Sequence, residues 1–170
     1  MEIAMTGFIQ RLGSKFTKSE HVPLFILLAG VFLLRVSGAT MIGEGGFDAV
    51  EEFHAAKKIL FGMEYGFIHR TVRFAAILPQ TLMLLVSGAS PGVYYFTPVV
   101  ASLISTFFLF RTSVLIIGRI PAFIVVVLYS VFPQVMVDGV HPRVSSFSVM
   151  YMLIALYFLV LFFRRCTQNS

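Results

Sequence analysis

Residues 43–73, GEGGFDAVEEFHAAKKILFGMEYGFIHRTVR, hold most of the acidic residues of the chain. Almost everything on either side of this stretch is apolar. Charges gathered between hydrophobic runs of membrane-spanning length are typical of the solvent-exposed part of a membrane protein. Any chemistry is therefore expected first in this stretch. Its acidic residues and histidines are Glu44, Asp48, Glu51, Glu52, Glu64, His54 and His69.

The composition indicates a membrane protein. The chain has 170 residues, of which 58% are hydrophobic and 12% charged, and its mean hydropathy is +0.89. Soluble domains have about 25% charged residues, and one of this size could not bury so much apolar surface. The net charge of +5 comes largely from basic residues that flank hydrophobic runs, where membrane topology places them. Basic residues are not interleaved with aromatic ones, so no nucleic-acid partner is predicted.

The hydrophobic pattern predicts an all-α fold, a polytopic transmembrane helical bundle with four to five spans. A basic cytoplasmic tail (1–21) precedes a single membrane domain (22–170). An amphipathic helix on the membrane surface is expected in the first outer loop, followed by a short or re-entrant apolar segment around Pro79. The expected spans are 22–42, 93–117, 120–137 and 144–163, the surface helix is 48–61, and the short segment is 74–88.

The distribution of basic residues favours four spans. If 74–88 crossed the membrane, most Lys and Arg residues would lie outside, against the positive-inside rule. With four spans, the N-terminus is cytoplasmic and both Asp48 and Asp138 lie on the other side. The protein is expected in the cell membrane or the endoplasmic reticulum.

The expected surface helix carries the first candidate carboxylate. Ala49, Phe53, Ala56 and Leu60 can share one apolar face at helical spacing. Asp48 follows a glycine-rich turn, where an aspartate commonly caps a helix N-terminus. The alternative is that Asp48 is a functional carboxylate in an outer pocket. Glu51, His54 and Lys58 are expected off the apolar face.

Three further sites have two interpretations each. Asp138, in DGVHPR (138–143), is either part of a polar turn or a second carboxylate near basic groups. Arg35, inside the first expected span, either snorkels to the interface or faces the bundle interior near a phosphate. Arg70 and Arg73, beside His69, are either interfacial anchors or an anion site.

Metal and redox motifs are lacking in the sequence. There is no HxxxH or HExxH pair, and the single cysteine, Cys166, excludes a Cys-rich metal site and an internal disulfide. No cofactor is predicted with certainty. A divalent cation accompanying a phosphate is left open, although no ligand motif supports it.

Four segments carry a resemblance to a known family. They are DAVEEFHAAKKILFG (48–62), SGASP (87–91), PVVASLISTFFLF (98–110) and IIGR (116–119). Their order resembles the N-terminal module of the GT-C superfamily of integral-membrane glycosyltransferases, of the protein O-mannosyltransferase and aminoarabinose-transferase type. Members typically have an aspartate in the first outer loop, an alanine-rich surface helix ending in L-x-G, and a later G-R pair. The corresponding residues here are Asp48, Ala55, Ala56, Leu60, Gly62, Gly118 and Arg119.

The chain departs from the family pattern at three points. Members often have Asp-Glu where this chain has Asp48-Ala49, and Asp138 only approximates their acidic motif after a later span. Members are also several times longer, so the resemblance covers the N-terminal module alone. The resemblance implies a truncated or partial module that transfers a sugar from a polyprenyl-phosphate donor on the non-cytoplasmic side.

The resemblance also implies roles for the candidate residues. Asp48 would be the general base that takes the acceptor proton. Arg70, Arg73 and Arg35 would bind the donor phosphate, and His69 and Asp138 would be secondary pocket residues. The partners implied are the bilayer, a polyprenyl-phosphate-linked sugar, and another membrane chain or a second copy. The alternative function is a non-catalytic membrane subunit or scaffold, and a small transporter ranks third.

Overall fold

A computed structural model describes residues 21–39, 47–62, 74–88, 92–141 and 144–168. Over these residues the protein is all-helical, which confirms the all-α part of the expected fold class. Seven helices are described: α2 (His21–Ala39), α3 (Phe47–Phe61), α4 (Phe74–Ser87), α5 (Gly92–Ile117), α6 (Arg119–Val131), α7 (Pro133–Asp138) and α8 (Val144–Gln168).

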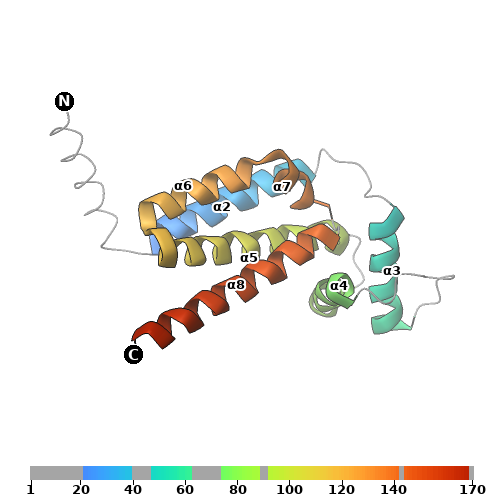
Figure 1. Cartoon of the computed structure of the whole chain (residues 1–170). Coiled ribbons are helices and arrows are strands. Elements are labelled where there is room, and N and C mark those ends of the chain that lie inside the picture. The colour runs from blue at the N-terminus through green and yellow to red at the C-terminus, as the bar shows by residue number, and fades with distance from the viewer. Residues whose placement is uncertain (1–20, 40–46, 63–73, 89–91, 142–143, 169–170) are drawn as a thin grey trace.

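Helix α5 is the centre of the arrangement. It contacts α2, α4, α6 and α8, and Figure 1 shows α2, α6 and α8 running alongside it. Helices α3 and α4 lie together at one end, where α7 also lies (Figure 1). The opposite end is formed by the start of α2, the α5–α6 junction and the end of α8.

Three apolar clusters hold the helices together. One joins α3, α4 and the start of α5 through Phe53, Ile77 and Tyr94, with the Phe53 and Tyr94 rings edge to face at 5.4 Å. A second joins α2, α5 and α6. A third joins α4, α5 and α8 around the fully buried Phe147. The clusters therefore surround α5 along its length.

Glycines in the left-handed conformation follow three of the helices, and Gly88 after α4, with φ +71°, is one of them. Gly62 has φ +65°, and its N–H donates to the Lys58 carbonyl at 3.0 Å, which is the helix end expected from the sequence. Gly118 has φ +83° and is the one residue between α5 and α6.

The expected single helix over 120–137 is interrupted. Helix α6 ends at Val131, and α7 begins at Pro133. Phe132 between them is extended, with φ −62° and ψ 127°. The proline ring clashes with a preceding residue in the α conformation, which accounts for the break.

Helix α3 is buried over a wider arc than expected. Phe53 and Ala56 are buried, as the amphipathic pattern indicated, but Glu51 and Glu52 are buried as well. The expectation that Glu51 lies off the buried face is therefore wrong. The helix packs against α4 and also contacts Tyr94 of α5, so its covered surface extends beyond the apolar stripe.

Two helices, α5 and α8, are both long and apolar enough to cross a membrane. The apolar stretches in α2, α4 and α6 are shorter. Large apolar side chains are exposed on α2, α6 and α8, so these helices present apolar outer faces. Examples are Phe25, Leu33, Ile124, Leu128, Phe158 and Phe162.

Candidate functional site

Arg35 lies in the interior of the bundle. Its side chain is 1% exposed. Its Nε donates to Ser102 Oγ of α5 at 3.2 Å, and its Nη2 donates to the Ser130 carbonyl of α6 at 2.9 Å. The snorkelling interpretation is therefore wrong, because acceptors inside the bundle hold the guanidinium there. Arg35 links three helices.

The break after α6 explains why a carbonyl is available to Arg35. In an uninterrupted helix, the Ser130 carbonyl would accept from the N–H of residue 134. The chain leaves the helix at Phe132, so the last carbonyls of α6 need other donors. A cation is also favoured at a helix C-terminus by the helix dipole. Pro133 thus leaves the Ser130 carbonyl without its helical donor, and Arg35, far away in the sequence, donates to it instead.

Gly139 allows Arg35 to occupy this position. It caps α7 in an ordinary right-handed conformation, so no backbone strain selects glycine here. A Cβ at this position would overlap Arg35 Nε and lie 2.7 Å from Arg35 Cδ and 3.0 Å from Ser102 Oγ. The absence of a side chain at residue 139 is therefore what makes room for the guanidinium.

The Arg35 guanidinium is incompletely satisfied. Its Nη1 is buried and has no hydrogen-bond partner in the described part of the chain. No described carboxylate lies within ion-pair distance of it either. A buried cation without a counter-charge is costly. The arrangement is therefore suited to an anion that completes the hydrogen bonding of Arg35.

A half-enclosed cavity of about 60 Å³ lies beside Arg35, between α5, α6, α7 and α8. Two of its lining residues, Ser102 and Gly139, are those that contact Arg35. Hydroxyl groups and one carboxylate dominate its polar lining. The residues that line it are Ser102, Ser105, Tyr129, Val135, Asp138, Gly139, Ser146 and Val149.

The turn between α7 and α8 is held by hydrogen bonds that place Asp138 at this cavity. Gln134 Nε2 donates to Asp138 Oδ1 at 3.1 Å. The Ser146 hydroxyl contacts the Asp138 carbonyl and lies 3.0 Å from the His141 carbonyl. His141 is itself buried. Asp138 is therefore in a defined position, as part of a fixed turn and also at the cavity wall.

The predicted site residues are only partly brought together. Asp138 lines the same cavity as Gly139 and Ser102, the two residues that contact Arg35. The backbone of Asp48 lies in the first turn of α3, and its side chain is outside the described residues, so the capping and functional interpretations both stay predictions. His69, Arg70 and Arg73 lie outside the described residues.

Sequence reasoning missed the cavity's hydroxyl groups. Ser102 and Ser105 are three residues apart on α5, which places them on one face of a helix. Such small polar residues in an apolar span were the available signal, because they are common where helices pack closely.

On α3, His54 has a shifted pKa. Burial lowers the pKa of His54, and the nearby Lys57 lowers it further. His54 is therefore neutral near pH 7.

Among the described residues, no three His, Cys, Asp or Glu side chains are grouped so that they could hold a metal ion.

Comparison with known proteins gave no relative. No family model matches the chain, and neither a curated protein nor a solved structure is significantly similar to it.

Proposed function

We propose that the protein crosses a membrane four times, through α2, α5, the α6–α7 pair and α8. The lengths support this topology. Helix α5 has 26 residues and α8 has 25, about 39 and 37 Å at 1.5 Å per residue. The 19 residues of α2 span about 28 Å, close to the ~30 Å of a hydrocarbon core. Lipid would cover the apolar outer faces of α2, α6 and α8.

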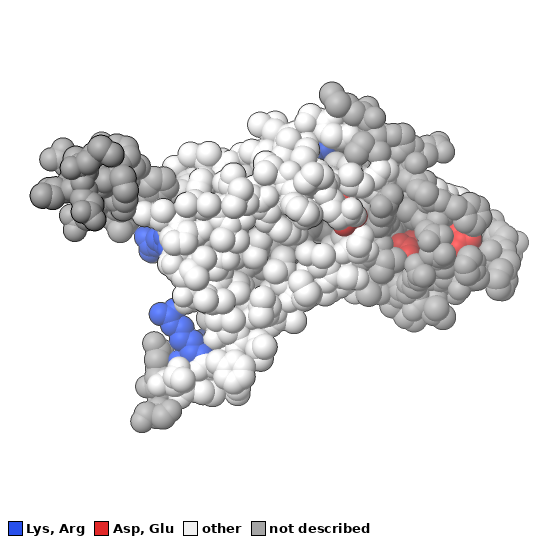
Figure 2. All heavy atoms as spheres, turned by 45° about the horizontal axis from the view of Figure 1, so that its top comes forward, with Lys and Arg blue, Asp and Glu red and all other residues white. Residues whose placement is uncertain are grey.

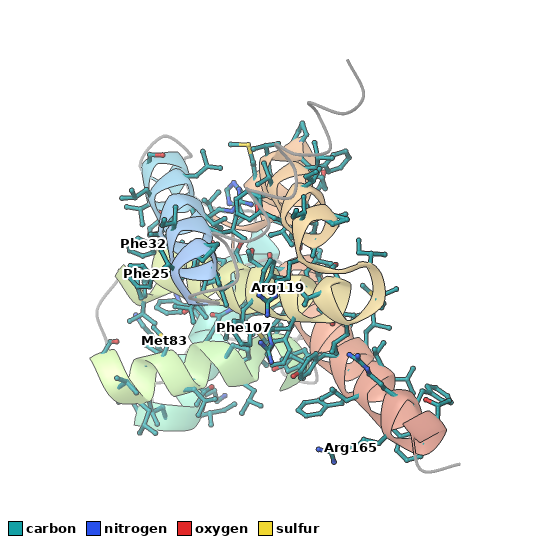
Figure 3. All side chains as sticks on the ribbon, turned by 90° about the vertical axis from the view of Figure 1, so that its left-hand side faces the viewer. Phe25, Phe32, Met83, Phe107, Arg119 and Arg165 are labelled. Carbon is teal, nitrogen blue, oxygen red and sulfur yellow. The ribbon has the colours of Figure 1, made fainter. Side chains whose placement is uncertain are left out.

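The charge distribution supports an orientation. Figure 2 shows Lys and Arg at the end where α6 begins and α8 ends, acidic atoms toward the α3 end, and a broad uncharged surface between them. A small basic patch also lies toward the α3 end. Figure 3 looks onto the basic end, where Arg119 and Arg165 lie. This end would be cytoplasmic by the positive-inside rule, and α3 would then be a surface helix on the other side.

The proposed activity is binding of a lipid phosphate at Arg35. The observation that carries it is the buried guanidinium with a free Nη1 and no described carboxylate within ion-pair distance. Arg35 lies four residues before the end of α2, about 6 Å along the helix. On the proposed topology, this is about one helical turn below the lipid head groups on the non-cytoplasmic side. Phosphate oxygens would supply the acceptors that Nη1 lacks.

The resemblance to GT-C glycosyltransferases gives this phosphate a role. The donor would be a polyprenyl-phosphate sugar in the non-cytoplasmic leaflet. An acceptor oxygen would attack the anomeric carbon while the bond from that carbon to the phosphate oxygen breaks. Polyprenyl phosphate would leave with the bonding electrons, stabilised by Arg35, and Asp48 would take the acceptor proton. Arg70 and Arg73 would be further phosphate-binding groups, and His69 and Asp138 secondary pocket residues.

Binding of polyprenyl phosphate to the purified protein in detergent tests the proposal. We expect saturable binding by the wild type and at least about tenfold weaker binding by Arg35→Gln, since a charge-assisted hydrogen bond contributes about 1.5–3 kcal/mol. Arg111→Gln is the matched control, because Arg111 is an exposed cation of α5. Arg35→Lys, which keeps the charge, should recover part of the affinity.

Two outcomes would overturn the proposal. Equal binding by wild type and Arg35→Gln would remove Arg35 from the site. No binding by the wild type would favour the alternative of a non-catalytic membrane subunit or scaffold. Where binding holds, full sugar transfer by Asp48→Asn would exclude Asp48 as the base.

A further inference from the structure

The cavity beside Arg35 is too small for a whole sugar ring. Its volume is about 60 Å³, whereas one water molecule needs roughly 10–15 Å³ by the same kind of measure. The space therefore suits a few heavy atoms, such as the end of a short chain. A hexose is larger than this, so the cavity has to receive another group.

The lining of the cavity is rich in acceptors. The Ser105 hydroxyl donates its proton to the Ala101 carbonyl at 2.8 Å, and Ser146 donates to the carbonyls of its own turn. Ser102 Oγ accepts from Arg35 Nε. The Ser105 and Ser146 hydroxyls therefore offer lone pairs to a guest, whereas those of Ser102 and Tyr129 can also donate, and Asp138 adds a carboxylate. The Asp138 carboxylate would repel an anion in the cavity, whereas an ammonium group would find several acceptors.

The Arg35 guanidinium next to the cavity favours an anion, whereas the cavity itself favours a cation. Arg35 presents a buried Nη1 without a partner among the described residues. The side chain lies against Gly139 and Ser102, both of which also line the cavity. A molecule that binds both Arg35 Nη1 and the cavity must carry an anion for the first and a compact hydrogen-bond donor for the second.

We infer that this site binds a phosphoethanolamine head group, with its phosphate on Arg35 and its ammonium group in the cavity by Asp138. The primary ammonium has three N–H donors for the cavity oxygens, whereas trimethylammonium has none and is bulkier. A serine head group would bring a carboxylate next to Asp138. The inference rests on the proposed function in taking Arg35 as the phosphate-binding group. It adds that phosphoethanolamine lipid competes with polyprenyl phosphate for Arg35.

The test compares head groups on the full chain in detergent. Short-chain phosphatidylethanolamine should bind at least about tenfold more tightly than phosphatidylcholine or phosphatidylglycerol. Asp138→Asn should remove most of that preference. Ser105→Ala, which alters the lining, should weaken the preference, and Ser113→Ala, a buried serine of α5 outside the cavity, should not.

The outcomes separate this inference from the proposed function. Equal affinity for phosphatidylethanolamine and phosphatidylcholine would overturn it, as would an unchanged preference in Asp138→Asn. Equal affinity for phosphatidylglycerol would overturn the assignment of an ammonium group. Soluble phosphoethanolamine that binds as tightly as the lipid would support the site and identify the free head group as its ligand. Absence of polyprenyl-phosphate binding with an intact preference for phosphatidylethanolamine would contradict the proposed glycosyltransferase alone.

Discussion

At the scale of single residues, Arg35 combines a structural contact with an available donor. Its Nη2 satisfies a carbonyl left over at the end of α6, which stabilises the break, while Nη1 has no described partner. A purely structural arginine would be expected to use its donors within the protein, since buried polar groups are rarely left unsatisfied. The unused nitrogen favours the proposed binding role over that of a helix cap alone.

Gly139→Ala tests the fit of Arg35. The added Cβ would overlap Arg35 Nε, so the guanidinium has to move. We expect a loss of about 1–3 kcal/mol in the free energy of unfolding, typical of overpacking, together with weaker phosphate binding. Unfolding in mixed detergent measures the first effect.

Gly30→Ala is the control for that substitution. No atom lies within 4 Å of the Cβ that it would add, and Gly30 is in the interior of α2. Alanine should therefore be neutral or stabilise the protein by up to about 1 kcal/mol through its higher helix propensity. Equal effects of the two substitutions would show that the position next to Arg35 is not tightly packed.

The sequence could indicate Arg35 and Asp138 as candidates but could not place them together. Helix α2 is apolar nearly all round, so periodicity does not say which face of it is covered. The groups that hold Arg35 are 67 and 95 residues away in the chain. Such contacts depend on how the helices pack, which local pattern does not encode.

At the scale of elements, the break between α6 and α7 creates the site. Removing Pro133 should allow residue 132 to become helical and join the two helices. In Pro133→Ala the N–H of Gln134 would donate to the Ser130 carbonyl and displace Arg35. We expect the Gln134 amide to exchange with solvent severalfold more slowly, as measured by hydrogen–deuterium exchange, and phosphate binding to weaken.

Pro121→Ala provides the matched control for this change. Pro121 is in the first turn of α6, where a missing N–H costs little. Its replacement should leave both exchange at Gln134 and phosphate binding unchanged. Unaltered exchange in Pro133→Ala would mean that packing against neighbouring helices, and not the proline, imposes the break.

Helix positions were predictable because apolar runs and glycines mark them. The helix end at Gly62 and the limits of α5 match the expectation closely. The burial of Glu51 and Glu52 was not predictable, because a carboxylate is ordinarily assigned to the solvent side. Their burial follows from tertiary packing of α3 at the end of the bundle.

At the scale of the whole molecule, the native cysteine reports the proposed orientation. Cys166 is exposed near the end of α8, at the basic end of the bundle. In right-side-out vesicles, a membrane-impermeant maleimide should label it only after permeabilisation. In Cys166→Ser/Lys58→Cys, the exposed position on α3 should be labelled without permeabilisation. Labelling of both positions from the same side would contradict the four-span topology.

The junction of α5 and α6 has a consequence for biosynthesis. A single residue, Gly118, separates the two helices, and they pack against each other. So short a connection would not let one helix enter a bilayer while the other stays at the membrane surface. In the proposed four-span topology, α5 would therefore be retained at the insertion machinery until α6 has emerged, and the two would enter the lipid together as one hairpin.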